Sequence, residues 1–273
     1  MKSKLDNKTI VIKLGGSLFD TKDTTIEDII YLQKQGYPIV VIHGGANMVN
    51  KWLEKQNITP LFNNGERITG KAEMDMVTAV IGGLMNKEIV ATIISRGGKA
   101  VGISGVDGAL IEGKIRNKEM GYVGNPVKVN HEVLTAILEA GFIPVVSPIS
   151  LNTVNREADD SLLLNINGDT IAGEIAASIK AEKLIFMTDV NGIRDDTGTY
   201  LPRLNHDEAK ELLDTGIAHG GMIPKIKACL RATGNPSTRC VIIDGNRKNA
   251  LIQEIEEGGT GTLIYNPQGE YND

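Results

Sequence analysis

The sequence has few of the features that mark secreted, redox-active or nucleic-acid-binding proteins. Only two of its 273 residues are cysteine, Cys229 and Cys240, and they form neither a disulfide framework nor a Cys-x-x-Cys redox pair. We expect both to be small buried residues of a protein that works in a reducing cytoplasm. Basic residues show no surplus, since 29 Lys and Arg stand against 34 Asp and Glu. The net charge of −5 therefore gives no electrostatic indication of nucleic-acid binding.

Long hydrophobic runs and targeting segments are lacking as well. No unbroken apolar run approaches the ~18 residues of a transmembrane helix, so we expect a soluble protein without a membrane partner. The segment 1–12 contains lysines but no apolar stretch before a cleavage site, and we expect no signal peptide. Aromatic residues make up only 4% of the chain, whereas 31 residues are glycine. This combination favours an α/β protein with many tight loops, in which glycine allows close approach to a ligand.

Short apolar runs alternate with longer amphipathic segments along the whole chain, a pattern typical of βαβ units. The apolar runs predict strands at 9–14, 39–42, 100–104, 143–147, 183–188, 239–243 and 262–264. The amphipathic segments predict helices at 25–36, 46–56, 69–95, 130–140, 167–180, 206–213, 222–232 and 248–256. The polar segment 107–129 predicts one or two β-hairpins. We therefore expect an α/β fold, a three-layer αβα sandwich with a central, mainly parallel sheet, divided into lobes 1–180 and 181–273.

Three of the predicted strands end in glycine-rich turns, which are Gly15-Gly16-Ser17, Gly44-Gly45-Ala46 and Gly105-Val106-Asp107-Gly108. Ligands of open α/β sheets bind beyond the carboxyl ends of the strands, where glycine lets backbone N–H groups approach an anion. The turns predict a phosphate or carboxylate site. Lys13 interrupts the first apolar strand, and a buried lysine is costly unless it is paired. We interpret it as an ammonium group that holds phosphate; a solvated lysine on an edge strand is the alternative.

Other polar residues fit the same kind of site. Arg67 precedes a predicted helix, where its planar guanidinium suits a carboxylate, unless it is a solvated loop arginine. The surrounding segment 65–72 resembles a P-loop, but alanine stands where the hydroxyl that binds Mg²⁺ belongs. Asn165, Asn167 and Asp169 alternate, so in an extended chain they would project to one side, although the last two also suit a helix cap. Lys225 lies near the predicted start of a helix, where the helix dipole disfavours a cation. A lysine at this position is explained if an anion binds beside it.

Several segments resemble the motifs of the amino acid kinase family, in the same order and over nearly the whole chain. They are IKLGGS at 12–17, IHGG at 42–45, GERIT at 65–69, NKEIV at 86–90, GYVG at 121–124, NINGD at 165–169, TDVNG at 188–192 and GGMIPK at 220–225. IKLGGS alone indicates only the wider family, whereas NINGD and GGMIPK together resemble the branch that acts on N-acetyl-L-glutamate. The resemblance implies ATP-dependent, in-line phosphorylation of that substrate's side-chain carboxylate, giving N-acetyl-L-glutamyl 5-phosphate in arginine biosynthesis.

The resemblance also implies a role for each motif residue. The catalytic residues would be two lysines that neutralise the phosphoryl group and an aspartate that holds them: Lys13, Lys225 and Asp169. The substrate-binding residues would be Gly44, Gly45, Arg67, Asn165 and Asn167. The nucleotide-binding residues would be Gly15, Gly16, Ser17, Thr188, Asp189 and Gly192. The four histidines show no ligand spacing, and we expect no metal held by the protein itself; Mg²⁺ would arrive with ATP, held mainly by its phosphates.

The chain departs from the family pattern at Ala46, Glu66 and Gly168, none of which is a proposed catalytic group. Eight residues precede the first predicted strand, whereas arginine-inhibited hexameric members carry an extra N-terminal helix. We therefore expect a homodimer that is insensitive to arginine. The main alternative is a kinase for a carrier-protein-linked glutamate or aminoadipate, although such members usually lack GGMIPK. Carbamate kinase, aspartokinase, a non-catalytic sensor and a Rossmann dehydrogenase fit the motifs less well.

Overall fold

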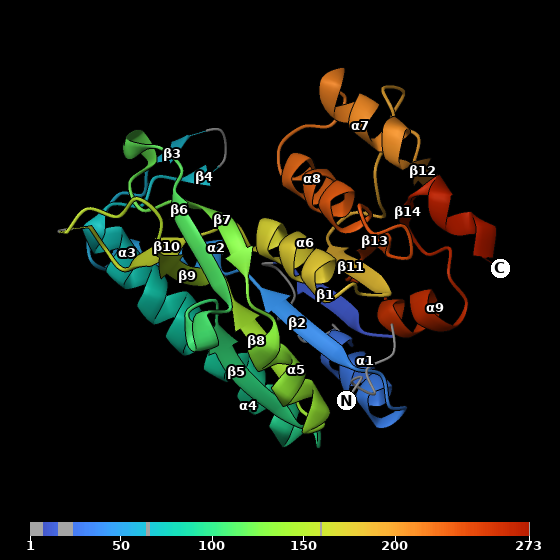
Figure 1. The fold of residues 1–273 in the computed structure, drawn as a ribbon, viewed down its shortest axis with the longest axis horizontal. Coiled ribbons are helices and arrows are strands. Elements are labelled where there is room, and N and C mark those ends of the chain that lie inside the picture. The colour runs from blue at the N-terminus through green and yellow to red at the C-terminus, as the bar shows by residue number, and fades with distance from the viewer. Residues whose placement is uncertain (1–7, 16–23, 64–65, 159, 273) are drawn as a thin grey trace.

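The computed structural model describes residues 8–15, 24–63, 66–158 and 160–272. An eight-stranded sheet crosses the molecule in the order β12-β14-β13-β11-β1-β2-β8-β5 (Figure 1). Neighbouring strands are parallel except β13 and β14, which confirms the mainly parallel sheet. The strands are β1 (Ile10–Leu14), β2 (Ile39–His43), β5 (Ala100–Ser104), β8 (Ile143–Ser147), β11 (Lys183–Thr188), β12 (Arg203–Asn205), β13 (Arg239–Asp244) and β14 (Thr262–Tyr265).

Helices cover both faces of this sheet, which confirms the predicted three-layer sandwich. One face packs against α5 (Glu132–Glu139), α6 (Gly168–Ser178), α7 (His206–Asp214) and α8 (Met222–Ala232). The other face packs against α1 (Thr25–Lys34), α4 (Asn86–Ser95) and α9 (Ala250–Glu256). Figure 1 shows α6 lying across β1 and β2, with α8 beside it. Because side chains alternate along a strand, Lys13 lies on the face of Val11, the face that α6 and α8 cover.

A smaller sheet and a helical layer extend the N-terminal half beyond the carboxyl ends of β1 and β2. The sheet has the order β10-β9-β6-β7, with bounds β6 (Ile111–Ile115), β7 (Gly124–Val129), β9 (Ile149–Asn152) and β10 (Leu163–Asn165). The hairpin β6–β7 is the one predicted at 107–129, whereas β9 was not predicted. Helix α2 (Ala46–Lys55) and the two-stranded ladder of β3 (Phe62–Asn63) and β4 (Glu66–Arg67) complete this end.

The longest helical segment, Lys71–Ser95, joins α3 (Lys71–Val77), the π-helix η1 (Thr78–Met85) and α4. The glycine pair lies inside the π-helical stretch, so it does not end the helix. Over 18 residues its mean hydropathy is 1.5, so by length and composition alone this helix would suit a membrane span, although it contains no unbroken apolar run of that length. Counting unbroken apolar runs misses a window that contains a few charges. A single such helix is weak evidence, because core helices of soluble proteins meet the same criterion.

Candidate functional site

Three charged side chains meet at the carboxyl end of the central strand β1. Lys13 Nζ lies 2.6 Å from Asp169 Oδ1, and Lys225 Nζ lies 3.0 Å from Asp169 Oδ2. Lys13 is 9% exposed and sits on a strand with neighbours on both sides, so the alternative of a solvated edge-strand lysine is wrong. One carboxylate thus holds two ammonium groups, and the cluster carries a net positive charge that suits an anion.

Local structure explains how Asp169 reaches this position. Asn167 caps α6, because its Oδ1 accepts hydrogen bonds from the backbone N–H groups of Asp169 at 2.8 Å and Thr170 at 3.4 Å. Asp169 is then in the first turn of α6, where the helix dipole favours a negative charge. Helix α8 comes close because α6 has a glycine at the crossing: a Cβ at Gly173 would lie 2.8 Å from Ala228. That close packing brings Lys225 of α8 to Asp169 of α6.

The electrostatics of the cluster follow from burial and pairing. Asp169 is only 4% exposed, and burial by itself would raise its pKa. The charges and hydrogen bonds of Lys13 and Lys225 outweigh burial and hold the pKa of Asp169 below its usual value. Asp169 is therefore ionised at neutral pH, and its charge is already matched by the lysines.

A cavity of about 240 Å³ lies next to this cluster. It collects seven of the residues singled out from the sequence: Lys13, Gly44, Gly45, Arg67, Asn165, Asn167 and Asp169. Gly44 has open space where a Cβ would be, so a ligand can approach its backbone. Lys225 joins the same site through Asp169.

Arg67 closes one side of the cavity and is only 8% exposed, so it is not a solvated loop arginine. Its Nη2 donates to Ala46 O at 3.2 Å and to Asn50 Oδ1, and its guanidinium lies 5.0 Å from the centre of the Phe62 ring. Burial lowers the pKa of Arg67, and Glu73 partly opposes this effect. Among the described residues, the buried Nη1 has no hydrogen-bond partner. A fixed guanidinium with a free N–H fits a carboxylate that enters the cavity.

The two asparagines differ in what they offer a ligand. Asn165 Nδ2 donates to Thr69 Oγ1 at 3.0 Å, which leaves its Oδ1 as a candidate acceptor at the cavity. The Asn167 side chain accepts from two backbone N–H groups as a helix cap, so the capping alternative holds for this residue. Asn167 nevertheless lines the cavity.

The described residues assigned to the nucleotide, Gly15, Thr188, Asp189 and Gly192, do not line this cavity. Gly15 follows β1, and a Cβ there would lie 2.9 Å from Met187 O, so glycine is needed for β1 to pack against β11. Thr188 ends β11 and its Oγ1 donates to Asp189 Oδ1 at 3.1 Å. A Cβ at Gly192, whose φ is +140°, would collide with Thr262. Gly16 and Ser17 lie outside the described residues.

Sequence reasoning missed the residues that hold Arg67 and its neighbour Glu66. Asn50 and Phe62 contact Arg67, and Arg116 forms an ion pair with Glu66. Asn50 lies one helical turn after Ala46, so an i, i+4 pairing on α2 was the available signal. The ion pair explains how an acidic residue is accommodated beside Arg67: its charge is matched by Arg116, whose Nε also donates to Asn125 Oδ1 at 2.9 Å.

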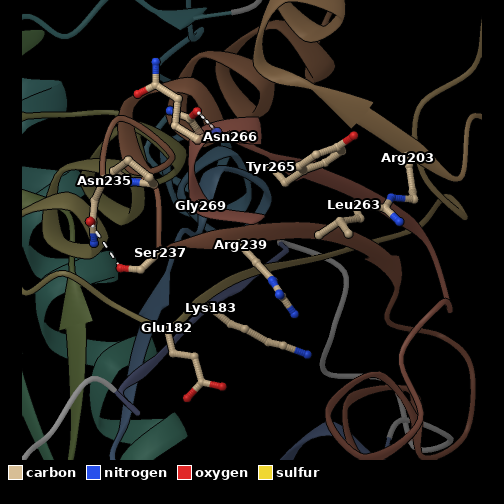
Figure 2. A pocket seen from close by; sticks show the side chains of 12 residues that line it. Glu182, Lys183, Arg203, Asn235, Ser237, Arg239, Leu263, Tyr265, Asn266 and Gly269 are labelled. Atoms are coloured by element: carbon tan, nitrogen blue, oxygen red, sulfur yellow. Dashed lines mark hydrogen bonds between the residues drawn. The ribbon is translucent and has the colours of Figure 1, made fainter. Parts of the chain in front are cut away.

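A larger hollow, about 960 Å³, lies at the opposite end of the sheet (Figure 2). Its side chains include Lys183 and Arg239, which begin the neighbouring strands β11 and β13, so it borders the amino ends of the parallel strands. Ligands of such sheets bind at the carboxyl ends. Lys183 is moreover paired with Glu254 at 3.6 Å. None of the residues singled out from the sequence lines this hollow.

Metal ligands are not grouped in the described part of the chain, where no three His, Cys, Asp or Glu side chains cluster. The one carboxylate at the centre of the site, Asp169, is paired with two lysines. The residues present therefore suit phosphate and carboxylate oxygens rather than a bare cation.

Comparison with known proteins decides the family. The model of the amino acid kinase family matches residues 8–244, which include every residue of the site described above. The chain belongs to the amino acid kinase family. A curated relative, the acetylglutamate kinase of Dehalococcoides mccartyi strain CBDB1, is 49% identical over 258 residues, which are 94% of each protein.

Solved structures agree on the fold. A protein of Streptococcus mutans UA159 superposes with a TM-score of 0.80 at 27% identity, over 95% of this chain and 99% of its own. Carbamate kinase of Giardia superposes with a TM-score of 0.69 at 17% identity, over 96% of this chain and 99% of its own. At that identity the likeness concerns the fold alone.

Proposed function

We propose that the protein phosphorylates the side-chain carboxylate of N-acetyl-L-glutamate with ATP, as an acetylglutamate kinase of arginine biosynthesis. The observation that carries the proposal is the cavity that joins a fixed guanidinium, Arg67, to two ammonium groups on one carboxylate, Lys13 and Lys225 on Asp169. Relatives named acetylglutamate kinase, such as the one that is 49% identical over nearly the whole chain, support the choice of substrate. The acetylglutamate kinases of Dehalococcoides mccartyi and Thermoanaerobacter pseudethanolicus, 49% and 42% identical, favour this substrate over a carrier-linked one.

The chemistry follows from charge. A carboxylate and a triphosphate repel each other, so the enzyme must bring anions together and neutralise them. In our proposal, Lys13 and Lys225 contact the transferring phosphoryl group from two sides, while Asp169 keeps both ammonium groups in place. The N–H groups of Gly44 and Gly45 bind its oxygens. A carboxylate is already a nucleophile, so the reaction needs positioning and electrostatic stabilisation and no general base.

Substrate recognition is assigned to the walls of the cavity. We propose that Arg67 binds the substrate α-carboxylate through its unpartnered Nη1 and that Asn165 binds the acetylamino end. Asn167, which caps α6, contributes mainly by holding Asp169 in place. The substrate carboxylate to be phosphorylated then faces Lys13.

Nucleotide binding is assigned to the C-terminal lobe, 181–273, and amino-acid binding to the lobe 1–180. The proposed nucleotide contacts are Thr188, Asp189 and Gly192 of the C-terminal lobe, joined by the turn Gly15, Gly16 and Ser17 of the N-terminal lobe. Mg²⁺ would supply charge neutralisation between the phosphates, which would be its main ligands, because Asp169 is already paired.

The assembly and location belong to the same proposal. Leu84 and Ile94 are exposed on the long apolar helix, at 36% and 54%, and a second copy of the chain would cover them in a homodimer. Gel filtration with light scattering should give a molar mass of two chains for the wild type, and I94E should lower it to the mass of a single chain. The free, buried Cys229 and Cys240 suit a reducing cytoplasm. Insensitivity to arginine stays a prediction, and inhibition by millimolar arginine would overturn it.

The activity is tested with a hydroxylamine trap, which converts an acyl phosphate into a hydroxamate. Purified protein is mixed with MgATP and N-acetyl-L-glutamate, glutamate or aspartate, and hydroxamate and ADP are measured. We expect hydroxamate with the acetylated substrate alone. If ATP binds but none of the three reacts, the carrier-linked alternative takes the place of this proposal; reaction with free glutamate instead would refute the proposed specificity.

A further inference from the structure

A buried histidine stands beside the glycine turn of the site. His43 ends β2 and is 1% exposed. Its Nδ1 lies 2.9 Å from Gly44 O, and its Nε2 lies 3.2 Å from Asn86 Nδ2. Burial lowers the pKa of His43 to about 4, the hydrogen bond to Gly44 opposes this, and the charge of Lys13 adds to it. The ring is therefore neutral at pH 7, and one of its nitrogens carries a proton while the other accepts.

Asn86 determines which nitrogen carries the proton. Its Nδ2 faces two carbonyl oxygens, Val145 O at 2.9 Å and Ile103 O at 3.3 Å, which can only accept. Its Oδ1 faces Lys87 Nζ at 3.1 Å, which can only donate. The orientation of the amide is thus fixed by its partners, and its two N–H groups are shared among the two carbonyl oxygens and His43 Nε2. Nε2 must then be the acceptor, and the proton is on Nδ1.

The protonated Nδ1 donates to Gly44 O and so orients the peptide between Gly44 and Gly45. In a planar trans peptide the C=O and N–H bonds point in opposite directions. Fixing the Gly44 carbonyl toward His43 therefore turns the Gly45 N–H away from it. Two successive glycines have no side chains to restrict this peptide, so the hydrogen bond supplies a constraint that the turn itself lacks.

The neighbouring π-helix supports the same arrangement. A Cβ at Gly45 would collide with Met85, the last residue of η1, and Asn86 follows directly as the first residue of α4. A Cβ at Gly102 would collide with Asn86 Oδ1, so the strand opposite leaves room for this side chain. One helical segment thus packs against the glycine turn and also holds the amide that fixes His43.

We propose that His43 and Asn86 are positioning residues that aim the Gly45 N–H at the anion bound in the cavity. This role rests on the proposed kinase function, because the anion is the transferring phosphoryl group or the carboxylate that receives it. The histidine acts as a fixed hydrogen-bond donor to the backbone and exchanges no proton during the reaction.

Two substitutions separate this role from simple filling of space. The amide of H43N lies where Nδ1 lies and can donate to Gly44 O, whereas the amide of H43Q extends toward the position of Nε2 and Asn86. Removing one oriented donor lowers kcat by ~10²–10³-fold, and a donor that is only misaligned loses part of this contribution. We expect H43Q and H43A to lose at least ~10-fold in kcat with little change in KM, and H43N to retain most of it. The exposed His131, as H131N, is the control and should match the wild type.

The tautomer gives a readout that does not depend on catalysis. Nitrogen-15 NMR of the wild type should show His43 neutral and protonated on Nδ1 between pH 6 and 8, and N86D should change that state. An Nε2-protonated ring in the wild type, or folded H43Q as active as H43N, would overturn the proposal. Absence of hydroxamate from the wild type would refute the proposed function instead, and would leave the NMR result to decide the orientation of the turn.

Discussion

Replacing Asp169 by asparagine keeps the shape of the side chain and removes the negative charge that pairs with both lysines. Lys13 and Lys225 contact opposite oxygens of this carboxylate, at 2.6 and 3.0 Å, and all three side chains are largely buried. Removing one partner of a buried ion pair costs ~3–5 kcal/mol, because the remaining charge is left without compensation. We therefore expect D169N to lower the free energy of unfolding by about 3 kcal/mol or more at pH 7 in the absence of ligand.

The same substitution should separate binding from catalysis. With both ammonium groups uncompensated, D169N should bind ATP at least as tightly as the wild type, while kcat falls by ~10²-fold or more because the lysines are no longer held in place. Urea titrations, calorimetry with ATP and steady-state rates measure the three quantities. Since the pKa of Asp169 lies below its usual 3.8, the stability difference should persist above that pH and shrink below it. Unchanged stability and unchanged kcat would refute the reasoning.

Three further substitutions test other parts of the structure. R67A should raise KM for N-acetyl-L-glutamate by roughly 10-fold or more with KM for ATP unchanged, since a charge-assisted hydrogen bond contributes ~1.5–3 kcal/mol; an unchanged KM would remove Arg67 from the substrate site. G173A should lower the free energy of unfolding by ~1–2 kcal/mol and reduce kcat, because its Cβ would lie 2.8 Å from Ala228. The strain of this contact exceeds the ~1 kcal/mol that alanine gains over glycine in helix propensity. A raised Tm would contradict this prediction. Burial lowers the pKa of His43 from 6.5 in the unfolded chain to about 4 in the folded protein. The free energy of unfolding of the wild type should therefore fall by roughly 3 kcal/mol as the pH drops from 6.5 to 4, because the unfolded chain takes up a proton that the folded ring does not. Urea titrations of H43N should lack this part of the pH dependence.

Sequence reasoning succeeds where one short-range pattern decides the structure. The strands at 100–104, 143–147 and 183–188 and the helix at 222–232 have the predicted bounds, because each is an apolar or amphipathic segment with glycine, proline or polar residues within two positions of its ends. It fails where pairing between distant segments decides. The strand Ile149–Asn152 alternates weakly and is stabilised by its ladders with β6 and β10. The π-helical stretch contains the glycine pair, which the sequence marks only as an interruption of a helix.

The candidate site shows the same division. Motif residues such as Lys13, Asp169 and Lys225 could be named from the sequence, because a lysine in an apolar strand and a lysine at a helix start are locally unfavourable and call for a partner. That Asp169 pairs them was implied only by the family resemblance and could not be worked out from local patterns, since 56 residues separate Asp169 from Lys225 and the packing of α6 on α8 brings them together. The role of His43 was hidden for the same reason: its partner Asn86 is 43 residues away.

The central claim is that the site catalyses phosphoryl transfer by neutralising charge with two lysines, and K225A tests it most directly. Its kcat for hydroxamate formation from N-acetyl-L-glutamate is compared with that of K227A, which removes an exposed lysine from the same helix. The account predicts that K225A lowers kcat by at least ~10²-fold with the fold intact, while K227A behaves like the wild type. A folded K225A protein with nearly normal kcat would contradict it.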